Sequence, residues 1–151
     1  MSDAWRRLEG WTVRGLDGTG EQKQIRMAYQ DFKELRVWQE AKQLAIEVYK
    51  ITGNARFSKD YGLRDQVQRA AVSIASNIAE GYERNSHKDF VRYLLIAKGS
   101  LSELRTQMEI ALQIGHIDEN VFEQIEDRCK KITGMLINLI KARRERYSEG
   151  K

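Results

Sequence analysis

Hydrophobic residues recur every three or four positions in four segments of the chain, the spacing that places them on one face of an α-helix. The first segment runs from about Phe32 to Ile51 and stops at Gly53, and the second runs from about Asp60 to Arg84. Their apolar positions are Phe32, Leu35, Trp38, Ala41, Ala45, Val48 and Tyr49 in the first, and Leu63, Val67, Ala70, Ala71, Ile74 and Ile78 in the second.

The third and fourth segments carry their own start and stop signals. Ser86 and Asp89 have the spacing of a capping box, and the third segment continues from there until Gly115. Asp118 is the expected N-cap of the fourth segment. The apolar positions of the fourth segment are Val121, Phe122, Ile125, Cys129, Ile132, Leu136, Leu139 and Ile140.

Four long helices joined by short connections favour one topology, because a short connection leaves consecutive helices antiparallel. We therefore predict an all-α fold, an antiparallel up-down-up-down four-helix bundle, formed by residues 27–151. A chain of 151 residues has room for one such domain with an ordinary core. The absence of proline agrees with long helices.

Residues 1–26 hold four of the eleven glycines and show no sustained helical or strand period. We interpret them as a flexible N-terminal leader. Helical periodicity begins directly after Met27, so one interpretation is that Met27 is the natural start and the leader is upstream read-through or added sequence. The other interpretation is a disordered tail that belongs to the protein, and both stay open here.

The stretch SIASNIAEGYERNS, residues 73–86, puts small and polar residues into the second helix. Small side chains let helix axes approach below the usual 8–10 Å or so. Gly81 and Gly99 each cost on the order of 1 kcal/mol in helix propensity, so we expect a close neighbour at both. Asn77 and Ser100 are candidates for a buried hydrogen-bonded pair that fixes the register. Close packing alone, without a ligand, is the simpler explanation of the small residues.

Composition narrows the class of protein only slightly. The net charge of +4 and the pI near 9.2 permit contact with nucleic acid without requiring it. Cys129 is the single cysteine, which excludes an internal disulfide and fits a small hydrophobic core position. We find neither a membrane-length apolar run nor a secretion signal, so we expect a cytoplasmic protein without a membrane partner.

The sequence lacks the motifs of the common catalytic and metal sites. A di-iron bundle needs Glu-x-x-His pairs, but His87 is preceded at that spacing by Arg84, and His116 by Gln113. No glycine-rich phosphate loop, hydrolase elbow or zinc motif occurs. We therefore expect no metal, no cofactor and no enzymatic activity, and we interpret both histidines as surface or capping groups.

Three stretches resemble a family of four-helix bundles named after proteins encoded in intervening sequences of bacterial 23S ribosomal RNA genes. They are FKELRVWQEAKQLAIEVYKIT, YGLRDQVQRAAVSIASNIAEGYER and FVRYLLIAKGSLSELRTQMEIALQIG, and the resemblance covers most of residues 27–151. Its most specific positions include Arg69, Ser73, Asn77, Glu80, Gly81, Gly99 and Ser100.

The resemblance implies a bundle that assembles into a ring-like homopentamer. It also implies kinship with the accessory variability protein of diversity-generating retroelements, a similar bundle whose basic ring works with a reverse transcriptase and RNA. The present chain differs from that relative in its small excess of positive charge.

The predicted topology separates charge along the bundle axis. Residues 31–40, 80–92 and 141–151 share one end and sum to +2, whereas residues 44–66 and 103–127 share the other end and sum to −5. In a ring with aligned ends, phosphate contacts would add across subunits. The alternative is that cations near a helix C-terminus complement its dipole and keep the protein soluble. The candidate nucleic-acid-binding residues are Arg84, Lys88, Arg92, Arg128, Lys130, Lys131, Lys141, Arg143, Arg144 and Arg146.

We therefore predict a non-catalytic oligomeric bundle that binds structured nucleic acid through a basic rim, with RNA favoured and DNA left open. The setting would be an rRNA intervening sequence or a related mobile element. The alternative is a scaffold whose ring surface binds a protein such as a reverse transcriptase.

Overall fold

A computed structural model of the chain describes residues 31–150, and the helical unit begins at Phe32. Two predictions, the leader over residues 1–26 and the natural start at Met27, lie outside the described residues. The unit contains the helices α3 (Arg36–Thr52), α4 (Tyr61–Glu83), α5 (His87–Gln113) and α6 (Glu119–Glu149). Two short 3-10 helices, η1 (Phe32–Glu34) and η2 (Phe57–Lys59), precede α3 and α4.

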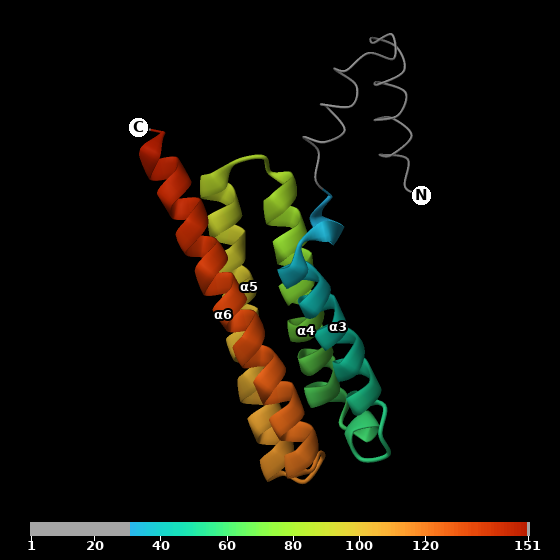
Figure 1. The fold of residues 1–151 in the computed structure, drawn as a ribbon. Coiled ribbons are helices and arrows are strands. Elements are labelled where there is room, and N and C mark those ends of the chain that lie inside the picture. The colour runs from blue at the N-terminus through green and yellow to red at the C-terminus, as the bar shows by residue number, and fades with distance from the viewer. Residues whose placement is uncertain (1–30, 151) are drawn as a thin grey trace, which may run out of the picture. The chain divides into compact units, whose positions relative to one another are not determined.

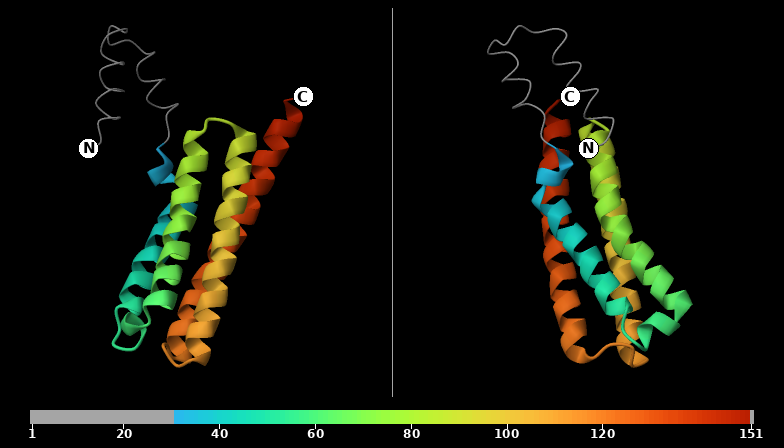
Figure 2. Two further views of the ribbon diagram at one scale, coloured as in Figure 1. Left: turned by 180° about the vertical axis from the view of Figure 1, so that it is seen from behind. Right: turned by 90° about the vertical axis from the view of Figure 1, so that its right-hand side faces the viewer.

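Consecutive helices run antiparallel and lie side by side, as Figures 1 and 2 show from three directions. The described residues form no strand. The predicted all-α, up-down-up-down four-helix bundle is therefore confirmed. Within residues 31–150, no helix combines the length and the apolar character needed to cross a bilayer.

Side-chain N-caps are present at three helices, at the two predicted positions, Ser86 and Asp118, and also at Asp60. The Asp60 side chain accepts a hydrogen bond from the Leu63 amide at 3.2 Å, and Asp118 accepts one from Val121 at 2.8 Å. The Ser86 hydroxyl accepts from the Asp89 amide at 3.3 Å. Each cap satisfies an amide that has no partner within its helix.

The first helix starts later than the sequence predicts. Phe32–Glu34 is a 3-10 turn, and Leu35 has the extended backbone angles φ −66° and ψ 121°, so α3 begins at Arg36. The apolar spacing from Phe32 onward therefore spans two elements. At the end of α5, Gly115 adopts φ +82°, a left-handed conformation that suits glycine and ends the helical run.

The core lies along the inner faces of all four helices. Cys129 is buried as predicted, and burial raises the pKa of its thiol to about 12. The predicted apolar positions of α4 are buried except Leu63, which is partly buried. In α3 the buried stripe is Val37, Ala41, Leu44 and Val48. Tyr49 was predicted on the apolar face of this helix but is 50% exposed. Apolar residues thus cover a wider arc of α3 than the arc that is buried in the core of the chain.

The two glycines predicted to have close neighbours differ. A methyl group on Gly81 would lie 2.4 Å from Tyr93 Cβ and 3.1 Å from Phe90 Cδ2, so α5 packs directly against this backbone. A methyl group on Gly99 would meet no atom within 4 Å. The prediction is confirmed for Gly81 and is wrong for Gly99 within the described residues, because Gly99 lies on the exposed side of α5.

A polar relay links α4 to α5 in place of the predicted direct pair. Asn77 Nδ2 donates to the carbonyl oxygen of Ser73 at 2.8 Å and lies 2.9 Å from its hydroxyl. The Ser73 hydroxyl lies 2.9 Å from that of Ser100. Asn77 thus reaches Ser100 only through Ser73, because its amide bonds one turn back along its own helix.

Hydrogen bonds join the α3–α4 connection to the α5–α6 connection. His116 Nε2 lies 2.9 Å from Asp60 Oδ2, and the Asn54 amide donates to the His116 carbonyl oxygen at 3.1 Å. Arg56 donates to the Gly115 carbonyl oxygen at 3.2 Å. The hydrogen bond with His116 is the main cause that lowers the pKa of Asp60. We call this group the connection clasp.

Candidate nucleic-acid interface

The topology brings together three segments that carry predicted nucleic-acid-binding cations. The end of α4, the start of α5 and the end of α6 lie at the same end of the bundle (Figures 1 and 2). We call this end the basic end. Seven of the ten predicted cations belong to these three segments, namely Arg84, Lys88, Arg92, Lys141, Arg143, Arg144 and Arg146.

Two cations at the basic end have carboxylate partners. Arg84 donates to Glu80 at 3.2 Å and to the Tyr93 hydroxyl at 2.8 Å. The hydrogen bond to Glu80 is the main cause that raises the pKa of Arg84. Arg92 lies 3.9 Å from Asp89 and above the ring of Tyr93. These pairs are exposed, so each contributes little to stability, yet they reduce the charge offered to a phosphate.

Arg143 packs between helices instead of pointing into solvent. Its guanidinium lies 5.2 Å from the centroid of the Phe90 ring and 3.2 Å from His87 Nδ1. Burial is the main cause that lowers the pKa of Arg143, followed by the like charge of Arg146. This side chain therefore joins the end of α6 to the start of α5, and it is a positioning group more than a free cation.

Of the three predicted cations in the middle of α6, two have carboxylate partners and one does not. Arg128 lies 2.8 Å from Glu47, and Lys131 lies 3.0 Å from Glu40, so both bridge α6 to α3. Lys130 is exposed and has no ion pair among residues 31–150. Arg128 and Lys131 are thus neutralised across the bundle.

Three of the cations that have no ion pair within residues 31–150 line a groove between α5 and α6. The groove has a volume of about 440 Å³, and three cations and one carboxylate, Glu145, line it. Its apolar lining includes Leu95, which is 43% exposed, and Ile137, which is 48% exposed. We call it the α5–α6 groove, and its cations are Lys98, Lys141 and Arg144.

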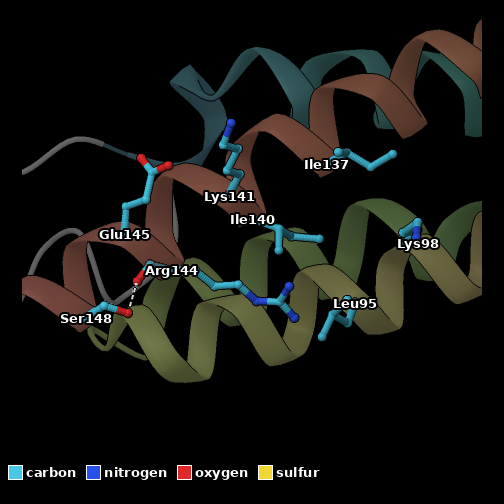
Figure 3. A pocket seen from close by; sticks show the side chains of 8 residues that line it. All are labelled: Leu95, Lys98, Ile137, Ile140, Lys141, Arg144, Glu145 and Ser148. Atoms are coloured by element: carbon cyan, nitrogen blue, oxygen red, sulfur yellow. Dashed lines mark hydrogen bonds between the residues drawn. The ribbon is translucent and has the colours of Figure 1, made fainter.

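Figure 3 shows how the side chains of this groove lie. The Arg144 side chain extends between α6 and α5, with its guanidinium between Ile140 and Leu95. Lys141 and Glu145 project from the other side of α6. Among the described residues, no carboxylate lies within ion-pair distance of Arg144. A guanidinium between two helices without a carboxylate partner is suited to bind an incoming anion.

Two further cations extend the charge beyond the groove. Lys88 lies two turns before Leu95 on the same side of α5, and Arg146 follows Arg144 on α6. Neither has an ion pair within residues 31–150. Within residues 31–150, the exposed cations of the basic end that lack a carboxylate partner are thus Lys88, Lys141, Arg144 and Arg146, and Lys98 of the α5–α6 groove adds a fifth.

The sequence analysis missed Lys98 and the two apolar residues of the groove. A signal was present, because Leu95 and Lys98 are three residues apart on α5, while Ile137, Lys141 and Arg144 follow at spacings of four and three on α6. Each set forms one stripe along its helix. Only the pairing of α5 with α6 shows that the stripes face the same groove.

A second surface is mainly apolar and lies between α3 and α4. Ile46 is 41% exposed, Tyr49 is 50% exposed, and Val72 is 42% exposed. The charged residues of its groove are Lys42 and Lys50. We call this surface the α3–α4 face. All three apolar side chains line the same groove.

Residues 31–150 contain no group of three or more His, Cys, Asp and Glu residues that could hold a metal ion. The two histidines instead take part in contacts between elements. His116 belongs to the connection clasp, and His87 lies against Arg143.

Comparisons with known proteins identify one family and one similar fold. The model of a family described as 23S rRNA-intervening sequence protein matches residues 33–138. A crystal structure of a protein of unknown function from the S23 ribosomal protein family of Bacteroides thetaiotaomicron VPI-5482 is 27% identical, with a TM-score of 0.65. The alignment covers 70% of this chain and 98% of that one. No curated protein matches the chain.

The family match ends before part of the basic end begins. It includes Lys88 and Lys98 on α5, but it stops at residue 138. Lys141, Arg144 and Arg146 therefore lie beyond the matched range.

Proposed function

The chain belongs to the 23S rRNA-intervening sequence protein family, and we propose that it is a non-catalytic, oligomeric bundle that binds structured nucleic acid, RNA in preference to DNA. The basic end is the proposed binding surface. Neither the family nor the similar crystal structure carries the name of an enzyme. The function therefore rests on the geometry of the chain's own cations.

The observation that carries the proposal is the unpaired Arg144 guanidinium between α5 and α6, with Lys98 and Lys141 on the same groove. A phosphate placed there would receive a charge-assisted hydrogen bond without first displacing a carboxylate. Lys88 and Arg146 provide further charge along the same end. Contacts of this kind hold a phosphate backbone and are independent of base sequence.

We also propose that the chain forms a homopentamer, which would repeat the basic end five times. The α3–α4 face supports an interface between copies, because Ile46, Tyr49 and Val72 expose apolar surface that one chain leaves uncovered. Gly99 supplies the complementary feature. It leaves space on the outer side of α5, between the exposed Ile96 and Ile110, where a neighbouring helix could approach closely.

The binding proposal is tested by fluorescence anisotropy with a labelled RNA hairpin. Arg144→Glu should weaken binding about tenfold or more, because it removes one phosphate contact and adds repulsion. Lys59→Glu is the matched control. It makes the same change of net charge at the opposite end of the bundle, on an exposed residue of η2, and should change affinity by less than about twofold. Equal losses in both variants would show that only net charge matters.

The runner-up function is a scaffold that binds a protein, such as the reverse transcriptase of a diversity-generating retroelement. The α3–α4 face is the observation that favours it, since its groove combines apolar side chains with Lys42 and Lys50. Gene context separates the two functions. A reading frame within a 23S rRNA gene supports the RNA role, and a neighbouring reverse transcriptase gene supports the scaffold.

A further inference from the structure

The α5–α6 groove combines charge with exposed apolar surface, and phosphate binding explains only the charge. Leu95 and Ile137 are 43% and 48% exposed and lie among Lys98, Lys141 and Arg144. A phosphate pressed against these two side chains would lose hydration without gaining a partner. The apolar lining therefore calls for a ligand that has an apolar part close to its anionic part.

We propose that the α5–α6 groove binds unpaired nucleotides of a structured RNA, such as a bulge, with a base against Leu95 and Ile137 and the adjoining phosphates on Arg144 and Lys98. This inference rests on the proposed RNA-binding function and names the part of the RNA that the groove selects. In a nucleotide the base supplies a flat, weakly hydrated surface, and the phosphate supplies the charge.

Duplex RNA fits the groove poorly for a physical reason. In an A-form helix the bases are stacked inside, and the surface displays riboses and phosphates. Leu95 and Ile137 would then face polar groups. Unpaired bases can leave the stack and pack against apolar or aromatic side chains. The groove volume of about 440 Å³ lies in the range of sites that enclose small organic groups.

The charge arrangement agrees with an occupant that carries several phosphates. Arg144 lies within the groove, whereas Lys141 projects from the other side of α6 (Figure 3). Lys98 lies on α5, so cations flank the apolar residues on both helices. A strand whose base enters the groove would keep its backbone close to positive charge on either side.

The test compares two RNA probes with the full chain at one fixed salt concentration. One probe is a blunt RNA duplex, and the other is the same duplex with a three-nucleotide bulge. Anisotropy should show that the bulged duplex binds about tenfold more tightly, a difference of about 1.4 kcal/mol, because only its unpaired bases can reach Leu95 and Ile137. Leu95→Ser combined with Ile137→Ser should abolish this preference and leave the binding of the blunt duplex unchanged.

Ile114→Ser is the matched control, because Ile114 is 53% exposed at the opposite end of α5. It should retain the tenfold preference. The substituted side chains are all exposed, and thermal unfolding checks that each variant is folded. If folding is nevertheless lost in the double variant, Leu95→Ser alone provides the comparison.

The outcomes separate this inference from the function on which it rests. Equal binding of both probes by the wild-type chain overturns the groove assignment and leaves the basic end intact as a phosphate surface. Failure to bind either probe overturns both. If the double variant changes the sedimenting mass of the protein, the groove is covered by another copy of the chain, and the nucleotide assignment is wrong.

Discussion

Gly81 allows α4 to approach α5 closely because it has no side chain. A methyl group at this position would lie 2.4 Å from Tyr93 Cβ, far inside van der Waals contact. The neighbouring atom belongs to the stem of a side chain that is fixed to α5 and therefore cannot move away alone. The cost of glycine in a helix is thus offset by close packing of two helices.

Gly81→Ala should lower the free energy of unfolding by about 1–3 kcal/mol, because the two helices must separate to admit the methyl group. Gly134→Ala is the control on α6, where a methyl group would meet no atom within 4 Å. It should be neutral or stabilise by up to about 1 kcal/mol through helix propensity. Urea unfolding followed by circular dichroism measures both values, and equal effects would contradict the close contact at Gly81.

At the scale of elements, the connection clasp joins the α3–α4 connection to the α5–α6 connection. Asp60 takes part twice, since it caps α4 through Leu63 and lies against His116. Both interactions favour the ionised carboxylate, so the pKa of Asp60 in the folded state lies below its ordinary value. The stability that Asp60 contributes is therefore present above its unfolded pKa and is lost as the pH falls through the lower folded value.

The wild-type free energy of unfolding should therefore fall more steeply below about pH 4 than that of Asp60→Asn, whose side chain still caps the helix but cannot ionise. The difference between the two proteins should be largest above that pH and shrink as the solution becomes more acidic. Unfolding by urea at a series of pH values measures this difference. Parallel pH profiles would show that the ionised Asp60 has no part in the clasp.

The four helices and the caps at Ser86 and Asp118 could be predicted because they depend on local chemistry. Which face of α3 packs into the core could not be predicted in this way. Trp38, Ala45 and Tyr49 repeat with the same period as the buried stripe of Val37, Ala41, Leu44 and Val48. Periodicity alone does not choose between two apolar stripes on one helix.

The candidate site was predictable only as a collection of charges. The three segments of the basic end could be expected at one end of the bundle, because the order of the helices fixes which termini meet. The partners of individual cations were not predictable, because they lie on other helices. Arg128 forms an ion pair with Glu47, and Arg143 packs over the ring of Phe90. The groove forms only where a stripe of residues on α5 faces a stripe on α6. The spacing of residues within one helix does not show which other helix it faces, so the groove could not be predicted.

At the scale of the whole molecule, two surfaces are not covered by any other part of the described chain. They are the apolar α3–α4 face and the open surface around Gly99. A ring needs two different surfaces that complement each other, because each copy contacts its two neighbours through opposite sides. These two features lie on different helices, and we propose them as the two surfaces of the interface between copies. The proposed pentamer would bring five basic ends together and allow several phosphate contacts at once.

The assembly should depend on Gly99 and not on Gly134. Gly99→Gln places a long side chain where a neighbouring helix is expected, so the mass measured by sedimentation should fall from five times the chain mass of 17.6 kDa toward a single chain. Gly134→Gln adds the same side chain at another open helical position and should leave the assembly intact. A wild-type protein that sediments as one chain would contradict the pentamer.

The salt dependence of RNA binding tests the central claim most directly. The wild-type chain should bind a bulged RNA hairpin with an affinity that falls steeply as salt rises. The logarithm of the affinity against that of the salt concentration should have a slope of about −3 or steeper, because each neutralised phosphate contributes about −0.7 to −0.9. Such a slope would mean that the unpaired cations of the basic end contact several phosphates. A slope near zero, or no binding at low salt, would contradict the account.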